Sequence, residues 1–373
     1  MFMRALGIIF SDLHTDTVDE LTRFRTLASV PFGGRYRLVD FALSNMVNAG
    51  ITRVGIIAKR NYQSLMDHIG SGKDWDLSRR NGGVTIFPPF GNYRSDSLYA
   101  NRLEAIKGLM GFISKANEEY VLMVDCDSVN VIDYHQVIQE HEERNADITV
   151  VYQKAEITPD LHPHMSLTIG EAGRVTSASL TSDVGTTANM AVNAWVIKRK
   201  LLYNLIDEAL AHGANNFERD IILHNTSLLN IYASEYEGPY LHISSLATYF
   251  ANNMKLLDSQ VRAEIFEQKN QAIYTKVRDS APTKYGKDAV VERCYIADGC
   301  VIEGTVRNSI LFRGVKIGKN TVVENSILMQ DTITGEHVKL NCVVADKNVT
   351  IRDRRNLSGC ETIPYYLGKN VMV

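Results

Sequence analysis

The carboxylate best placed to do chemistry is Asp127. It follows the apolar run 120–124, which has the composition of a buried strand. In α/β proteins ligands bind at the carboxyl ends of such strands, and carboxylate oxygens hold Mg²⁺ there. A single carboxylate holds Mg²⁺ weakly, because the ion keeps its waters unless several oxygens act together. Asp127 is therefore interpreted either as a metal ligand or as a residue that caps a turn.

The elements that must position this residue alternate along the first two thirds of the chain. Short runs rich in β-branched residues predict strands, and the longer stretches between them have helical periodicity. This alternation is typical of an α/β architecture with a largely parallel sheet. The predicted strands are 6–10, 53–57, 120–124 and 148–152, and the predicted helices are 40–49, 97–113 and 133–144.

The C-terminal part of the chain has a different sequence pattern, because a four-residue phrase recurs in it. The start-to-start spacings are 15, 17 and 16 residues. Repeats of this length, with Ile or Val inward and Asn or Gly at corners, predict the stacked coils of a parallel β-helix. A small β-sandwich with chance similarity is the alternative. The phrases are RCYI (293–296), NSIL (308–311), NSIL (325–328) and NCVV (341–344).

Composition excludes two classes of partner. The 373 residues are 45% hydrophobic and 22% charged, and the formal net charge of −3 gives no field that would attract nucleic acid or an anionic membrane. The apolar start of the chain is too short for a signal peptide, and no stretch reaches the roughly 20 apolar residues of a membrane span. Five cysteines without CxxC spacing predict no disulfide framework. We expect a cytoplasmic protein.

The segment 25–45, RTLASVPFGGRYRLVDFALSN, carries a family resemblance. It is similar to the stretch R-A-K-P-A-V-P-F-G-G-x-Y-R-L-I-D-F-x-L-S-N of ADP-glucose pyrophosphorylases, the glucose-1-phosphate adenylyltransferase family. The resemblance implies a reaction in which glucose 1-phosphate attacks the α-phosphate of ATP, while Mg²⁺ and cations neutralise the phosphates. Further similarity covers nearly the whole chain, at 67–77, 82–90, 95–101, 125–134 and 274–304.

The resemblance also implies a fold. It predicts a Rossmann-like, GT-A-like nucleotidyltransferase domain with a mixed sheet over residues 1–258. A linker is expected at 259–288. A left-handed parallel β-helix of the hexapeptide type is expected over 289–373.

The phosphate-binding parts of the family pattern are missing. The family follows its first strand with a loop like A-G-G-x-G-T-R-L, whereas this chain has FSDLHTD at 10–16, without a glycine or the arginine. Asp12 and Asp16 would repel a polyphosphate, since like charges about 4 Å apart cost about 4 kcal/mol near a protein surface. The family lysine of R-A-K-P is Leu27 here.

The sugar and metal motifs are altered as well. Asp127 matches the aspartate of the family's G-D-H motif, and Asp96 matches the aspartate of G-T-A-D-A, where Tyr93 replaces the glycine. We interpret both aspartates as vestigial, with no catalytic set intact. The family motifs E-E-K-P, D-F-G-K-D and W-x-D-V-G-T appear as SLTS (179–182), NFERD (216–220) and YLHISS (240–245).

The chain keeps the scaffold motifs of the family but lacks most of its catalytic motifs. In this combination it resembles the GlgD-type, regulatory branch of the family. The resemblance implies a non-catalytic or weakly catalytic subunit in glycogen biosynthesis that activates a GlgC-type catalytic partner. A mixed tetramer is expected, and a homo-oligomer is the alternative in isolation. No cofactor is firmly expected, and Mg²⁺ is expected only with residual nucleotide binding.

Five cations form a second candidate site. Allosteric sugar phosphates bind between the two domains in this family, near the PFGG segment, and these cations flank it. They are interpreted either as an effector phosphate site or as solvated surface charges and interface ion pairs. The five are Arg25, Arg35, Arg37, Lys59 and Arg60.

Two other functions stay open at this point. One is an active sugar-phosphate nucleotidyltransferase with a rearranged site. The other is a hexapeptide acyltransferase, whose catalytic histidine among the coils could only be His337, because no other histidine follows His242.

Overall fold

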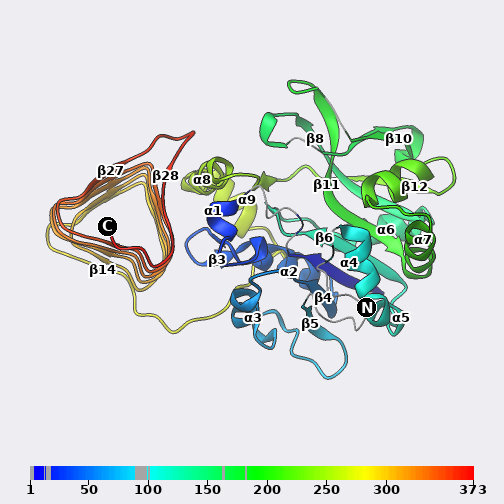
Figure 1. Ribbon diagram of the computed structural model, residues 1–373, viewed down its shortest axis with the longest axis horizontal. Helices are drawn as coiled ribbons and strands as arrows, with labels where there is room; N and C mark the ends of the chain where they lie inside the picture. Colours follow the sequence, from blue (N-terminus) through cyan, green and yellow to red (C-terminus); the bar gives the residue numbers. More distant parts are fainter. Residues whose placement is uncertain are drawn as a thin grey trace.

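The computed structural model describes residues 4–11, 13, 18–88, 99, 101–161, 164–180 and 183–373. In these residues a mixed α/β sheet domain precedes a triangular solenoid, which forms the C-terminal end of the molecule (Figure 1). None of the helices in the described residues is both long and apolar enough to cross a membrane.

A nine-stranded sheet forms the centre of the first domain, with the path β10-β9-β11-β6-β1-β4-β5; β8 pairs with β11, and β12 pairs with β8. Strands β5, β4, β1 and β6 are parallel, and β11 runs antiparallel to β6. The strands are β1 (Ala5–Phe10), β4 (Arg53–Ile57), β5 (Gly83–Phe87), β6 (Tyr120–Asp125), β8 (Ile148–Glu156), β9 (Ser166–Ile169), β10 (Val175–Ser179), β11 (Thr187–Lys198) and β12 (Ile231–Glu235). The four strands predicted from the sequence are confirmed.

Helices cover both faces of this sheet. The helices are α1 (Asp19–Thr22), α2 (Leu38–Asn48), α3 (Gln63–Ile69), α4 (Arg102–Gly108), α5 (Met110–Ser114), α6 (Tyr134–Glu143), α7 (Arg199–Ala211), α8 (Leu246–Met254) and α9 (Ser259–Phe266). The predicted helix 97–113 is two helices, because the α-helix is interrupted at Leu109 between α4 and α5. Stretch 259–288, expected as a linker, contains α9 and the first solenoid strand.

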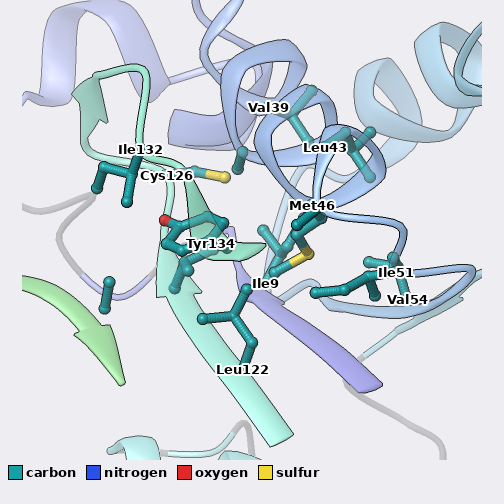
Figure 2. Packing of buried hydrophobic residues seen from close by; sticks show 14 of the residues in the cluster. Ile9, Val39, Leu43, Met46, Ile51, Val54, Leu122, Cys126, Ile132 and Tyr134 are labelled. Atoms are coloured by element: carbon teal, nitrogen blue, oxygen red, sulfur yellow. The ribbon is translucent and has the colours of Figure 1, made fainter. Parts of the chain in front are cut away.

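The core shows why these residues pack as they do. Figure 2 shows Met46 of α2 on the side of the helix that faces Ile9 of β1, and Leu43 belongs to the same buried cluster. Helix α2 approaches β1 so closely that a Cβ on Gly7 would lie 2.5 Å from the Met46 sulfur. The absence of a side chain at Gly7 therefore allows α2 to pack directly against β1.

The solenoid consists of three parallel five-stranded sheets, which excludes the β-sandwich alternative. One sheet has β14 (Lys284–Tyr285), β17 (Val301–Ile302), β20 (Lys316–Ile317), β23 (Ile333–Thr334) and β26 (Thr350–Ile351). The second has β15 (Val290–Glu292), β18 (Thr305–Arg307), β21 (Val322–Glu324), β24 (Lys339–Asn341) and β27 (Asn356–Ser358). The third has β16 (Tyr295–Ile296), β19 (Ile310–Leu311), β22 (Ile327–Leu328), β25 (Val343–Ala345) and β28 (Tyr365–Leu367).

The third sheet of the solenoid also forms the contact between the domains. Its outward residues Ile310, Ile327 and Val344 belong to one buried cluster with Phe32 and Tyr249 of the first domain. In Figure 1 helices α1, α8 and α9 lie on the side of the first domain that faces the solenoid. Two domains that share an apolar cluster move as one unit more readily than two domains joined by a polar interface.

Candidate functional site

Several of the sequence-based predictions cannot be placed. Asp12 and Asp16 of the phosphate loop, and Tyr93 and Asp96 of the base region, lie outside the described residues. The same holds for 181–182, the end of the altered sugar motif.

Asp127 lies in the turn that leaves β6, as the sequence indicated, and its side chain is 2% exposed. Two nitrogen-bearing side chains converge on it. Asn193 Nδ2 donates to Oδ2 over 3.3 Å, and His242 Nε2 lies 3.4 Å from the same oxygen. Asn193 reaches it from a bulge in β11, where the register shifts and its φ is 53°. Bulges of this kind redirect side chains.

His242 is held in place by strand pairing. Strand β13 (Leu241–His242) pairs antiparallel with β7 (Ser128–Val129), so that His242 faces Ser128 and lies beside Asp127. The Tyr240 ring stacks on the imidazole at 6.1 Å with an interplanar angle of 9°. Burial and the Asp127 carboxylate raise the pKa of Tyr240 well above its usual range. The Tyr240 hydroxyl therefore stays neutral.

Sequence reasoning missed two residues of this region, Asn193 and Arg102. The Arg102 guanidinium is buried and bonds both carboxylate oxygens of Asp125, at 2.6 and 2.8 Å, and Glu218 at 3.1 Å. Burial lowers the pKa of Arg102, but the two carboxylates outweigh it and hold that pKa above its ordinary value. The rings of Phe10 and Trp195 lie 4.6 and 4.5 Å from the guanidinium carbon. The buried guanidinium of Arg102 is thus fully engaged.

A sequence signal for Arg102 does exist. It occupies the first turn of α4, after the Asn101 cap, where the helix dipole disfavours a cation. Such a residue is expected to be held by carboxylates from elsewhere in the fold.

A cleft of about 280 Å³ opens beside Asp127. Its described lining contains no lysine or arginine. Arg219, which replaces the lysine of the D-F-G-K-D motif, is turned to solvent and bonds Asp220 at 2.6 Å and Asn215 at 2.8 Å. The lining residues are Leu161, His164, Met165, Leu180, Met190, Ala191, Asn193, Asn216, Glu218, Tyr240 and His242.

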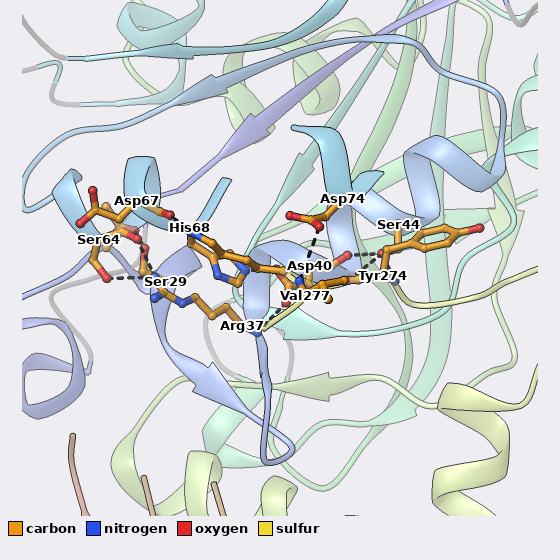
Figure 3. A network of polar contacts seen from close by, with 12 residues as sticks. Ser29, Arg37, Asp40, Ser44, Ser64, Asp67, His68, Asp74, Tyr274 and Val277 are labelled. Carbon is orange, nitrogen blue, oxygen red and sulfur yellow. Dashed lines mark hydrogen bonds and ion pairs between the residues drawn. The ribbon is translucent and has the colours of Figure 1, made fainter. Parts of the chain in front are cut away.

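A second, smaller pocket lies between the domains, and we call it the cationic pocket. Arg35 and Arg37 line it together with cations from residues 276–278 and from the solenoid. Its described lining contains no carboxylate. Figure 3 shows Arg37 reaching Ser64, whose carbonyl and hydroxyl oxygens it bonds at 2.6 and 2.9 Å. The other lining residues are Pro31, Gly34, Tyr36, His68, Lys276, Arg278, Phe312, Arg313, Gln330 and Lys347.

The charges in the cationic pocket are crowded. Burial lowers the pKa of Arg37 to about 10. Burial and the nearby charges of Arg37 and Arg25 lower the pKa of Lys347 well below its usual range. His68 also lines the pocket, and its Nε2 lies 2.6 Å from the Asp40 carboxylate. An anion entering this pocket would relieve repulsion between cations.

Comparison with known proteins decides the family. Residues 18–160 match the nucleotidyl transferase model, and residues 280–359 match the GlmU-like C-terminal hexapeptide model. Glycogen biosynthesis protein GlgD of Bacillus subtilis (strain 168) is 32% identical over 98% of this chain and 96% of its own length. GlgD of Geobacillus stearothermophilus is 35% identical, covering 86% of this chain and 83% of its own length. The glucose-1-phosphate adenylyltransferase of Clostridium botulinum (strain Alaska E43 / Type E3) is 32% identical, covering 82% and 80%.

The chain belongs to the glucose-1-phosphate adenylyltransferase family.

Adenylyltransferase chemistry implies Mg²⁺, and the residues present do not fit this ion. Among the residues that the structure describes, no group of three or more His, Cys, Asp or Glu side chains could hold a metal. Oδ2 of Asp127 is contacted by nitrogen groups of Asn193 and His242, whereas Mg²⁺ needs further oxygens. The residues that the structure describes therefore support no metal-dependent step at this place.

The five cations predicted as an effector site are only partly brought together. Arg35 and Arg37 line the cationic pocket. Arg25 is buried nearby and bonds both oxygens of Asp346 in the solenoid, at 2.8 and 2.9 Å. Lys59 lies over the Tyr99 ring and Arg60 is exposed, and neither lines the pocket. The pocket also contains four cations from the C-terminal part of the chain. They were not predicted, because only the fold brings them next to Arg35 and Arg37. These cations are Lys276, Arg278, Arg313 and Lys347.

Proposed function

We propose that this protein is a regulatory subunit with little or no activity of its own, which binds and activates a GlgC-type catalytic glucose-1-phosphate adenylyltransferase in glycogen biosynthesis. The observation that carries the proposal is the cleft beside Asp127, whose described lining has no cation for phosphates and no oxygen cage for Mg²⁺. Removing one preorganised contact costs about 10² to 10³ in rate. These losses are not additive, but several missing together leave little catalysis.

The preserved scaffold supports the partnership. The solenoid has apolar side chains exposed on its first coil, where Tyr285 and Val290 are 54% and 40% exposed. Its last turns expose Ile363 and Met372, at 75% and 59%. Exposed coil ends of a solenoid are association surfaces unless they are capped. We propose that they contribute to a mixed tetramer with the catalytic subunit.

Activation needs no chemistry from this chain. A subunit that binds the active conformation of its partner more tightly than the inactive one shifts the equilibrium by the difference in contact energy. A difference of about 1 to 3 kcal/mol gives about 5- to 150-fold activation. The apolar cluster shared by the two domains transmits such a bias, since a solenoid and sheet packed as one unit shift together.

Co-purification tests this proposal. The catalytic subunit is expressed alone and with this chain, the complex is isolated, and pyrophosphate release from ATP and glucose 1-phosphate is measured. We expect a stable complex with higher kcat or a lower KM than the catalytic subunit alone. Failure to form a complex, or a complex with unchanged kinetics, would contradict the proposal.

The cationic pocket supports a second function, the binding of a phosphate-bearing effector. In the described lining six arginines and lysines face no carboxylate of the lining itself, although Arg313 pairs with Asp298 beside it, so an anion would be favoured there. The test is calorimetric titration of sugar phosphates into the wild type, Arg35→Ala and the control Arg60→Ala. We expect binding to be lost in Arg35→Ala and kept in Arg60→Ala, whose side chain is outside the pocket. Equal heats from all three proteins would contradict it.

A further inference from the structure

Two nitrogen-bearing side chains contact one oxygen of the Asp127 carboxylate. Its Oδ2 atom is approached by Asn193 Nδ2 at 3.3 Å and by His242 Nε2 at 3.4 Å. Mg²⁺ binds carboxylate oxygens at 2.0–2.1 Å and requires further oxygens around it. Nitrogen-bearing groups therefore stand on the Oδ2 side of this carboxylate, where an ion shared with position 242 would have to bind.

The two groups also come from different elements. His242 is on β13, which pairs with β7, and Asn193 is in the bulge of β11. Asp127 leaves the end of β6, and its carbonyl accepts a hydrogen bond from Ile243 N at 2.7 Å. One carboxylate therefore ties together three segments that are distant in the sequence.

We propose that His242 takes the place of a divalent cation beside Asp127, so that the cleft is held together without metal. The imidazole is the group that keeps metal out, and the Tyr240 ring stacked on it fixes its orientation. A carboxylate at position 242 would stand beside Asp127, because His242 Nε2 already lies 3.4 Å from Oδ2 of that residue. Carboxylates arranged in this way are the ligand set that Mg²⁺ and Mn²⁺ select. A single substitution therefore creates a divalent cation site.

The substitution His242→Asp tests the proposal directly. Mn²⁺ is titrated into the isolated full-length chain, and free Mn²⁺ is followed by its paramagnetic resonance signal. We expect His242→Asp to bind about one Mn²⁺ per chain, about tenfold or more tighter than wild type, a change at least as large as those made by outer-shell partners of metal ligands. The matched variant His242→Asn, which has the same shape without the charge, is expected to stay at the wild-type level.

Two further results complete the test. Adding Asp127→Asn to His242→Asp should abolish the new binding, and Mn²⁺ should raise the Tm of His242→Asp but not that of wild type. The proposal is overturned if wild type binds Mn²⁺ as tightly as His242→Asp, or if the folded His242→Asp variant shows no gain.

A measurement on the wild-type protein keeps the proposal testable even if His242→Asp fails to fold. Bound Mn²⁺ broadens the proton resonances of groups near it. We expect the His242 ring resonances to stay sharp in millimolar Mn²⁺, and their selective broadening would contradict the proposal. These experiments use neither nucleotide nor partner subunit, so their outcome is separate from that of the proposed activation.

Discussion

At the scale of single residues, the first domain contains a buried arginine that is paired with two carboxylates. Arg102, Asp125 and Glu218 satisfy one another beneath the rings of Phe10 and Trp195. Removing one partner of a buried ion pair leaves the other charge without compensation, which costs about 3 to 5 kcal/mol. The guanidinium and the two carboxylates are engaged with each other here.

Arg102→Met should therefore lower the free energy of unfolding by about 3 to 5 kcal/mol, because Asp125 is left buried and unpaired. Urea unfolding followed by circular dichroism measures it. Arg219→Met is the control, since Arg219 pairs with Asp220 at the surface and should change little. Equal effects of the two substitutions would show that the buried network contributes no more than a surface pair.

A buried histidine makes stability depend on pH. Burial lowers the pKa of His141 from 6.5 to about 4, while Nδ1 bonds the Thr149 hydroxyl. The unfolded chain binds this proton first as the pH falls, so stability is full above pH 6.5 and falls between pH 6.5 and about 4.

The loss attributable to His141 is about 3 kcal/mol. His141→Gln should flatten the dependence of unfolding free energy on pH across this window, measured by urea titrations at several pH values. The exposed His135→Gln serves as the control and should leave the slope unchanged. An unchanged slope in His141→Gln would refute this assignment.

At the scale of elements, the corners of the solenoid explain the repeated Asn of its sequence. Asn308 and Asn325 have left-handed φ values of 43° and 45°. In the fourth coil the left-handed residue is Cys342, with φ 51°, so the phrase predicted at 341–344 lies one residue later, at 342–345. The asparagine side chains form a ladder, from Asn308 to Asn325 at 2.6 Å and from Asn325 to Asn341 at 2.9 Å. Asparagine tolerates the left-handed conformation and offers both a donor and an acceptor, so each coil locks onto the next.

Asn325→Ala and Asn325→Gly separate these two roles. Both lose the ladder bonds, at about 1 kcal/mol each, but only alanine is strained at positive φ. We expect Asn325→Ala to be less stable than Asn325→Gly by about 1 kcal/mol in thermal unfolding. If alanine were equal or better, the corner conformation would not explain the repeat.

Elements also mark the limit of what the sequence predicts. The strands around Asp127 and the coils of the solenoid follow from local patterns of apolar and corner residues, so both were predictable. The contact of His242 with Asp127 was not, because it needs the β7–β13 pairing and the bulge at Asn193. The sequence showed that His242 replaces the aspartate of the W-x-D motif. It did not show that the His242 side chain would face Asp127.

At the scale of the whole molecule, one buried ion pair joins the two domains. Arg25 and Asp346 are 321 positions apart and only 2% and 1% exposed. Tyr366 also donates to Asp346 at 2.9 Å. The pair lies beside the cationic pocket and the shared apolar cluster, so the segment that follows the phosphate-loop position is fixed to the solenoid.

Arg25→Met should destabilise the protein by about 3 to 5 kcal/mol, because Asp346 stays buried without its partner. Adding Asp346→Asn should recover part of the loss, a coupling that a double-mutant cycle of urea unfolding measures. Arg307→Met removes an exposed ion pair of the solenoid and should have little effect. Additive effects of the two buried substitutions would contradict the coupling.

We propose that this chain keeps the adenylyltransferase fold without carrying out the reaction by itself. Pyrophosphate release by the isolated chain, supplied with ATP, glucose 1-phosphate and Mg²⁺, tests it most directly. We predict no turnover above background without a catalytic subunit. Turnover by the chain alone at the rate of a catalytic family member, abolished by Asp127→Asn, would contradict the account.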